Sequence, residues 1–186
     1  DDLDVLKREA LLANPLLDFD RLLVIKRKPI GEPRRSQWDG FGLGEYLGVP
    51  RQSSWANGTM PNVDQWTNEI AALSPVRPDG KLSTLFAPDD TRLVTDVDLN
   101  FEGDKLMFSM PDKHKRWQIC ELGADGKGFH QLTPPDQPDV HNYDSCYLPN
   151  GRILFLSTAP LQGVPCNSGV IVGMMYQMDA DGRNIH

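Results

Sequence analysis

Two consecutive stretches of this chain, residues 94–133 and 142–186, share one order of short apolar runs and turns. The first contains LMFSM, WQICEL and the turn ADGKG, and the second contains ILFLST, MMYQM and ADGR in the same order. Phe108 corresponds to Phe155 at an offset of 47 residues. Each run has the length of a β-strand and is bounded by turn residues. A repeat of about 40 to 50 residues with four short strands predicts blades of a β-propeller.

The second unit is longer because its Asp-Gly turn, at 181, lies 56 residues after the one at 125. We expect the extra residues, within PLQGVPCNSG, to form a loop between the second and third strands of that unit. In the first unit, VTDVDLNF alternates apolar and polar residues, which predicts Val97, Leu99 and Phe101 on one face and the acidic side chains on the other. A calcium loop is excluded there because Phe101 and Met107 stand where such a loop needs glycine and glutamate.

The remaining chain divides into an N-terminal helix with linker, residues 1–20, and a propeller segment, residues 21–186. The helix is predicted over 2–13 because apolar residues recur every three or four positions and Asn14-Pro15 ends it. We expect its apolar stripe to pack on the outside or the end of the propeller, the alternative being a helix that binds a partner. The predicted fold is all-β, a partial propeller of two to three four-stranded blades.

The segment 21–186 begins with a predicted strand at 22–28 and returns to strands at 68–74 and 82–87. Between them lies a predicted loop excursion, 30–67, which contains three tryptophans. Long loops inside compact domains are often functional, and aromatic side chains suit a binding hot spot. We therefore interpret this excursion as a candidate interaction loop, with the tryptophans Trp38, Trp55 and Trp66. The basic run 26–35 is interpreted as a solvated strand end and loop.

The apolar run, Asp-Gly turn and return in residues 106–133, and again in 153–186, resemble the TolB-like blade with PD40 repeats. More narrowly, REALLANPLLDFDRLLVIKR together with YDSCYLPNGRILFLSTA and GVPC resembles the propeller domain of hydrazine synthase alpha subunit-like proteins, common in planctomycete bacteria. That resemblance implies an exported, periplasmic protein whose parent belongs to a multihaem redox assembly. Haem c in that family is attached through CxxCH, which this sequence lacks, so any haem is expected elsewhere in the parent.

Three functional hypotheses remain open at this point. The first is a non-catalytic scaffold and recognition segment whose partners are the rest of the propeller and cytochrome-type domains or subunits. The second is a TolB-like protein-interaction module. The third is part of a propeller enzyme whose site lies in other blades, because no nucleophile-plus-base motif occurs here and no catalytic residue is assigned.

Charge and length restrict the partners of this chain. A net charge of -7 argues against a nucleic-acid-binding surface, and no apolar stretch reaches the length of a membrane span. Two and a half blades cannot close a ring, which needs at least four, and the sequence ends before its last unit completes a fourth strand. We therefore expect the chain to be a piece of a longer protein.

The stretch DVHNYDSC is the strongest candidate for chemistry, because His141, Asp144 and Cys146 are potential metal ligands and Cys166 could return close to them. The alternative is structural, with the aspartate binding backbone donors in the adjoining loop. A disulfide between Cys146 and Cys166 would tie down the insertion. Cys120, in WQICEL, is predicted to be a buried free thiol.

Overall fold

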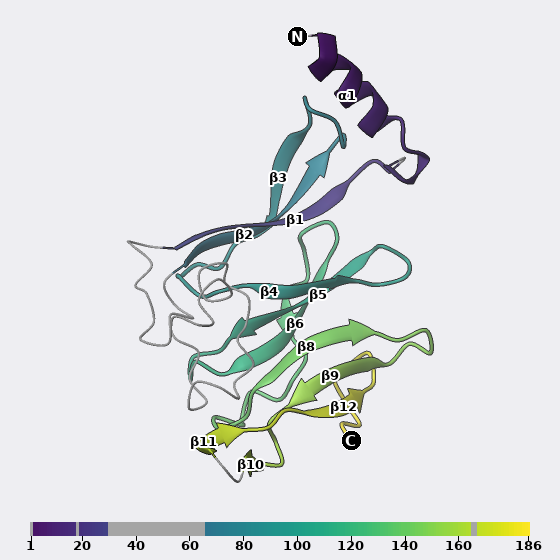
Figure 1. Cartoon of the computed structure of the whole chain (residues 1–186). Helices are drawn as coiled ribbons and strands as arrows, with labels where there is room; N and C mark the ends of the chain where they lie inside the picture. The colour runs from purple at the N-terminus through teal and green to yellow at the C-terminus, as the bar shows by residue number, and fades with distance from the viewer. Residues whose placement is uncertain (1, 18, 30–65, 165–166) are drawn as a thin grey trace.

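The computed structural model describes residues 2–17, 19–29, 66–164 and 167–186 of the chain. One short helix precedes three antiparallel sheets of three or four strands each, stacked one upon another (Figure 1). This confirms the predicted all-β fold, a partial β-propeller with a short N-terminal helix. The elements are α1 (Asp2–Leu12), η1 (Pro15–Leu17), β1 (Leu22–Pro29), β2 (Trp66–Ser74), β3 (Lys81–Phe86), β4 (Thr95–Leu99), β5 (Lys105–Pro111), β6 (Trp117–Gly123), β7 (His130–Gln131), β8 (Asn142–Tyr147), β9 (Ile153–Ser157), β10 (Gly163–Val164), β11 (Asn167–Ile171) and β12 (Met174–Met178).

In each sheet, strands that follow one another along the chain lie side by side. The first sheet has the order β1-β2-β3, the second β4-β5-β6-β7 and the third β12-β9-β8. The insertion in the third sheet was predicted to be a loop, but it contains a small hairpin of β10 and β11. Pairing these two strands satisfies backbone groups with hydrogen bonds inside the insertion.

The first and second sheets share a strand register. Pro29 pairs with Trp66 across β1 and β2, and Pro111 pairs with Trp117 across β5 and β6. Strand β1 therefore corresponds to β5, β2 to β6 and β3 to β7. It follows that, among the described residues, the first sheet has no counterpart of β4, the strand that begins the second sheet.

Apolar side chains fill both junctions between sheets. Phe108 of β5 packs with Ile70 of the first sheet, and Met107 and Ile119 of the second sheet pack with Phe155 of the third. All five side chains are fully buried or nearly so. Successive side chains of a strand point to opposite faces, which is why the neighbours Met107 and Phe108 serve different junctions.

The Asp-Gly turns add a backbone contact between neighbouring sheets. Gly126 has a φ of 82°, and a Cβ there would lie 2.8 Å from the carbonyl oxygen of Leu85 beside it. Gly182 repeats this arrangement, with a φ of 80° and the carbonyl oxygen of Leu132 at 2.3 Å from a Cβ position. Each turn thus rests on the outer part of the preceding sheet, where only glycine fits.

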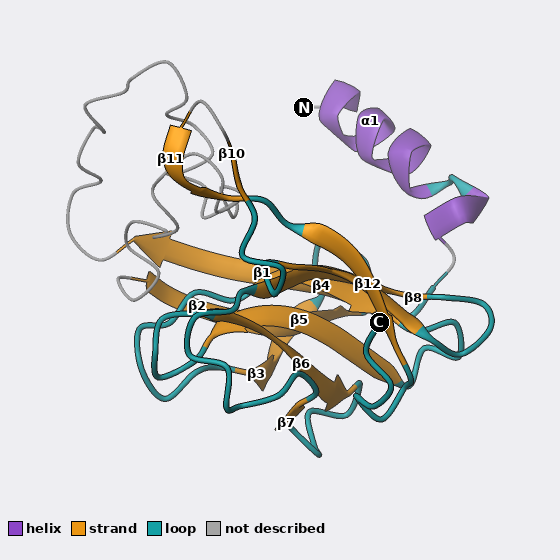
Figure 2. Cartoon of the chain, turned by 90° about the horizontal axis from the view of Figure 1, so that it is seen from below, coloured by secondary structure: helices purple, strands orange, loops and turns teal. Residues whose placement is uncertain are grey.

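Helix α1 lies apart from the sheets in both views (Figure 1, Figure 2) and has no buried residue. Its leucines Leu3, Leu6 and Leu11 are exposed. The prediction that its apolar stripe packs on the propeller is therefore wrong. The helix lies apart from the described strands, so no surface covers its large apolar side chains. None of the described helices has the length and apolar character that crossing a membrane requires.

The predicted alternation along residues 96–101 holds within β4 but not beyond it. Val97 and Leu99 line the same cavity next to β1, whereas Asp98 accepts the Tyr147 backbone N–H on the side of the third sheet. A bulge between Thr95 and Asp98 interrupts the pairing of β4 with β5, and Asp96 adopts a left-handed φ of 52°. Strand β4 ends at Leu99, so Phe101 lies in the following turn and is exposed.

Candidate functional site

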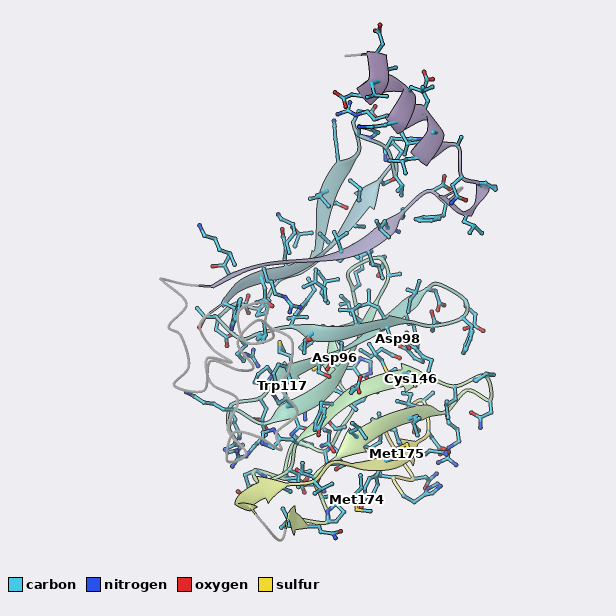
Figure 3. The ribbon with its side chains drawn as sticks, viewed as in Figure 1. Asp96, Asp98, Trp117, Cys146, Met174 and Met175 are labelled. Atoms are coloured by element: carbon cyan, nitrogen blue, oxygen red, sulfur yellow. The ribbon has the colours of Figure 1, made fainter. Side chains whose placement is uncertain are left out.

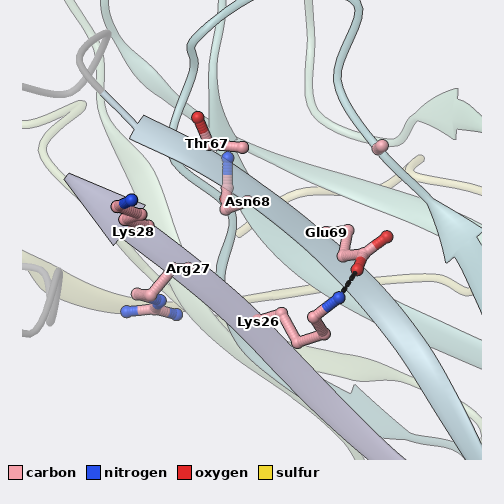
Figure 4. Close-up of a pocket in the computed structure, with 7 residues that line it drawn as sticks. Lys26, Arg27, Lys28, Thr67, Asn68 and Glu69 are labelled. Carbon is pink, nitrogen blue, oxygen red and sulfur yellow. Dashed lines mark hydrogen bonds and ion pairs between the residues drawn. The ribbon is translucent and has the colours of Figure 1, made fainter. Parts of the chain in front are cut away.

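A pocket of about 330 Å³ lies where β1 ends and β2 begins (Figure 4). Its lining contains three consecutive cations and one carboxylate, and consists of Lys26, Arg27, Lys28, Thr67, Asn68, Glu69 and Ala87. Lys26 forms an ion pair with Glu69, and Thr84 also donates a hydrogen bond to that carboxylate. These two donors hold the pKa of Glu69 below its ordinary value. We call the face with Lys26, Lys28 and Glu69, turned away from the second sheet, the front face.

Arg27 connects this region with the second sheet. Its side chain is half-buried, and its Nη2 donates to the carbonyl oxygen of Val94 at 3.0 Å. Burial lowers the pKa of Arg27, because desolvation disfavours the cation, while the nearby carboxylate of Asp96 opposes that change. Arg27 thus lies beside the bulge of β4.

The strands that begin the second and third sheets carry matching aspartates. Asp96 in β4 and Asp144 in β8 both lie at bulges and both have a left-handed φ, 52° and 54°. The backbone nitrogen of Asp144 donates to Ser109 Oγ at 3.3 Å, linking the third sheet to β5. Burial raises the pKa of Asp96, and the neighbouring charge of Asp144 adds to that rise. Asp96 Oδ2 is buried and makes no hydrogen bond in the structure.

His141 is occupied by structural contacts. It is almost fully buried, its Nδ1 accepts the Trp117 backbone N–H at 3.3 Å, and its Nε2 lies 3.4 Å from Arg116 Nη1. Its own backbone nitrogen donates to Thr158 Oγ1 at 2.9 Å. Asp144, by contrast, is exposed. The two residues therefore occupy different environments.

Three of the four residues proposed as metal ligands, His141, Asp144 and Cys146, lie in the described part of the chain. Cys166 lies outside the described residues, so the disulfide with Cys146 and the metal site that includes both thiols stay predictions. Among the residues that the structure describes, no three His, Cys, Asp or Glu side chains gather as a metal ion would need. Cys146 is half-buried, and burial, together with Asp98 and Asp144, raises its pKa.

Cys120 matches its prediction. It is buried in β6 as a free thiol, and it belongs to the apolar cluster between the first and second sheets. Burial raises its pKa to about 12. The thiol therefore stays protonated at neutral pH and acts as a small apolar side chain.

The candidate interaction loop needs one correction. Trp66 is the first residue of β2, with 4% of its surface exposed, and it packs with Leu93, Trp117 and Tyr143. It belongs to the core because strand pairing with β1 already starts at this residue. Trp38 and Trp55 lie outside the described residues, so their role as contacts stays a prediction.

The opposite end of the stack is apolar. At the offsets of the repeat, Leu154 of the third sheet corresponds to Met107 and Met175 corresponds to Ile119. Met107 and Ile119 are fully buried, whereas Met175 is 74% exposed. Figure 3 shows Met174 and Met175 at the end of the stack away from β1. We call the face with Leu154, Met175 and Gln177, turned away from the second sheet, the rear face.

A polar network also joins the second and third sheets. Glu121 accepts hydrogen bonds from Lys105 Nζ and the Tyr147 hydroxyl, each at 3.1 Å, while Asp98 Oδ2 accepts the Tyr147 backbone N–H at 2.9 Å. Burial, followed by the charge of Glu121, raises the pKa of Tyr147. The phenol thus remains a neutral donor and fixes the two sheets relative to each other.

Sequence reasoning missed the two ends of the stack as surfaces. The basic run was interpreted as a solvated strand end, and Lys26 and Lys28 are indeed exposed at the end of β1. What was missed is that Lys26 occupies the position of Phe108 when both strands are aligned on their final prolines. That alignment was the available signal. For Met175, the signal was its correspondence with Ile119 within the repeat.

No family model matches the chain, and no curated protein matches it. Among solved structures, the chain is similar to a protein described as TolB from Agrobacterium tumefaciens, with 15% identity and a TM-score of 0.45 over 72% of this chain and 39% of that one. It is also similar to a chain of a nidogen/laminin complex, with 14% identity and a TM-score of 0.44 over 65% of this chain and 41% of that one. The chain spans less than half the length of either.

Proposed function

We propose that this chain is a non-catalytic scaffold and recognition segment of a β-propeller, in which the rear face stacks on a further sheet of the same type. The observation that carries this proposal is the exposure of Met175 at a position equivalent to the buried Ile119. A large exposed apolar side chain at a repeated packing position marks a contact surface. The occupant follows from the repeat, because the equivalent face of the second sheet already accepts the third sheet.

Hydroxyl-radical footprinting tests this proposal with the chain alone and with the protein as purified from its natural source. Met175 should be labelled in the chain alone and protected in the native protein. Phe101, which is exposed in the turn after β4, is the matched control and should be labelled in both. Equal labelling of Met175 in the two samples would contradict the proposal.

The resemblance to hydrazine synthase alpha subunit-like proteins supports a finer assignment, which rests on the quoted sequence stretches alone. On that assignment the chain belongs to an exported, periplasmic bacterial protein, with haem c carried by other domains or subunits. On that assignment the propeller holds cytochrome-type partners in place. The alternative is a TolB-like module that binds a protein without haem. An optical spectrum of the native protein distinguishes the two, because haem absorption bands are expected only for the redox assembly.

A further inference from the structure

The pocket at the end of β1 is cationic, although the chain as a whole is acidic. Its lining carries three cations, at positions 26–28, against the single carboxylate of Glu69, whereas the whole chain has a net charge of -7. Charges of one sign that line a concave surface concentrate ions of the opposite sign there. The volume of about 330 Å³ is at the lower end of the range for pockets that bind small molecules. The pocket therefore has the size and the charge for a small anion.

Two of the three cations already have partners. Lys26 forms an ion pair with Glu69. The guanidinium of Arg27 donates to the Val94 carbonyl oxygen, on the side of the second sheet. Lys28 differs from both, because it is exposed and, within the described residues, its ammonium group has no ion pair or hydrogen bond. Lys28 thus leaves one positive charge of the pocket uncompensated.

A hydroxyl group accompanies this ammonium group. Thr67 of β2 pairs with Lys28 across the two strands, and both residues line the pocket. Directly paired residues of antiparallel strands lie on the same face of a sheet. Figure 4 shows the two on adjoining strands, apart from the Lys26–Glu69 ion pair. In the part of the chain that the structure describes, the Thr67 hydroxyl makes no hydrogen bond. An ammonium group and a hydroxyl donor on one face can together bind a carboxylate or a phosphate.

The packing of the sheets does not account for these cations. When β1 and β5 are aligned on their final prolines, Lys28 corresponds to Met110 and Lys26 to Phe108. Both equivalents are buried in the apolar cluster between the first and second sheets. The repeated architecture therefore places apolar side chains at these two positions, and the two lysines of the first sheet need another explanation.

We propose that the pocket binds the anionic group of a small molecule, a carboxylate or a phosphate, with Lys28 and Thr67 as the direct donors. Lys28 supplies the charge and the Thr67 hydroxyl donates one hydrogen bond. Lys26 and Arg27, which keep their own partners, add positive potential. The site is separate from the proposed function, which concerns the rear face, so either can fail without the other.

The test titrates the full chain with two probes, sodium phosphate and sodium succinate, while sodium chloride keeps the ionic strength constant. Backbone amide shifts in NMR spectra report binding at residues 26–28 and 67–69. We expect saturable shifts there with at least one probe and a Kd on the order of 1 mM, as for a site with one charged and one neutral donor. Tighter binding of phosphate would assign the site to phosphate esters, and tighter binding of succinate to carboxylates.

Substitutions identify the donors. Lys28→Gln should weaken binding about tenfold, as for the loss of a charge-assisted hydrogen bond, and Thr67→Val about threefold. Lys127→Gln, at an exposed lysine of a turn outside the pocket, should bind like the wild type. Shifts that do not saturate, equal shifts in sodium chloride alone, or undiminished binding by Lys28→Gln would overturn the proposal. All three side chains are exposed, and the wild-type titration decides the proposal even if one variant fails to fold.

Discussion

The two ends of the sheet stack carry opposite chemistry at equivalent positions. On the front face, Lys26 and its partner Glu69 stand where the second sheet has the buried Phe108 and Cys120. On the rear face, Met175 is as apolar as its buried counterpart Ile119. Within one repeated architecture, therefore, one end carries a charged pair where the buried junctions carry apolar side chains, and the other end keeps an apolar side chain there.

The buried junctions explain why this difference matters. Phe108 packs in the junction between the first and second sheets, and Phe155 packs at the corresponding position of the next junction. A lysine and glutamate in that position would have to be desolvated on stacking, which costs more than an exposed ion pair returns. A blade with such a front face therefore favours solvent or a polar partner.

The sharpest test of the comparison removes the side chain at the two equivalent positions. Phe108→Ala should lower the free energy of unfolding by about 3 to 5 kcal/mol, because it leaves a cavity in a packed junction. Lys26→Ala should change it by less than about 1 kcal/mol, because it removes only a partly exposed ion pair. Chemical denaturation of both variants measures the two values. Similar losses would show that the front position is also part of a packed junction.

The Asp-Gly turns allow a second test, with a matched control inside the chain. Gly182→Ala should destabilise the fold by about 1 to 3 kcal/mol more than Gly151→Ala, since the added methyl meets the Leu132 carbonyl. Gly151 has nearly the same φ, 79°, but a Cβ there meets no atom within 4 Å. Thermal unfolding monitored by circular dichroism compares them. If both substitutions lower the stability of the fold equally, the turn at Gly182 does not fix the spacing between sheets.

The buried carboxylate of Asp96 predicts that the stability of the fold depends on pH. The folded-state pKa of Asp96 is raised above its ordinary value of 3.8, so the folded chain binds this proton more tightly than the unfolded chain. The stabilisation is complete below pH 3.8 and is lost as pH rises through the folded-state pKa. Asp96→Asn should therefore gain stability relative to the wild type across this rise and keep the gain at neutral pH.

Urea denaturation at several pH values between acid and neutral measures that difference. Asp89→Asn removes an exposed carboxylate before β4 and serves as the control for the loss of one negative charge. A constant offset between Asp96→Asn and the wild type at every pH would refute the role of burial.

Exchanging the chemistry of the two ends should have the smallest effect on stability. Met175→Lys and Lys26→Met are each expected to change the free energy of unfolding by less than about 0.5 kcal/mol, because both side chains are exposed. Their effects on association should be opposite. Analytical ultracentrifugation should show less self-association for Met175→Lys and more for Lys26→Met. Unchanged sedimentation of both variants would mean that neither face governs association.

The repeat predicted the second and third sheets well because short apolar runs and Asp-Gly turns are local signals. The bulge at Asp96 was not predicted, since a bulge is fixed by pairing with β5 and leaves the polar and apolar order of the sequence unchanged. The exposure of α1 was also missed. Periodicity shows that a helix has an apolar stripe, but whether another surface covers that stripe depends on tertiary structure.

The candidate site was less predictable than the fold. Single residues such as His141 were chosen as ligands by type, but their hydrogen bonds to Trp117 and Thr158 come from parts of the chain 17 to 24 residues away. Trp66 was assigned to a loop because the strand pattern of β2 begins with it and is unclear at that end. The surfaces at the ends of the stack emerge only when repeats are compared position by position in three dimensions.

The difference between the two ends of the stack also bears on the order in which the sheets are synthesised and packed. Of the three stacked sheets, the one with Lys26 and Glu69 is synthesised before the other two, and its outer side is charged. Each later sheet meets an apolar surface already in place and can fold against it as a template. Ribosomal order and stacking order therefore coincide in this chain.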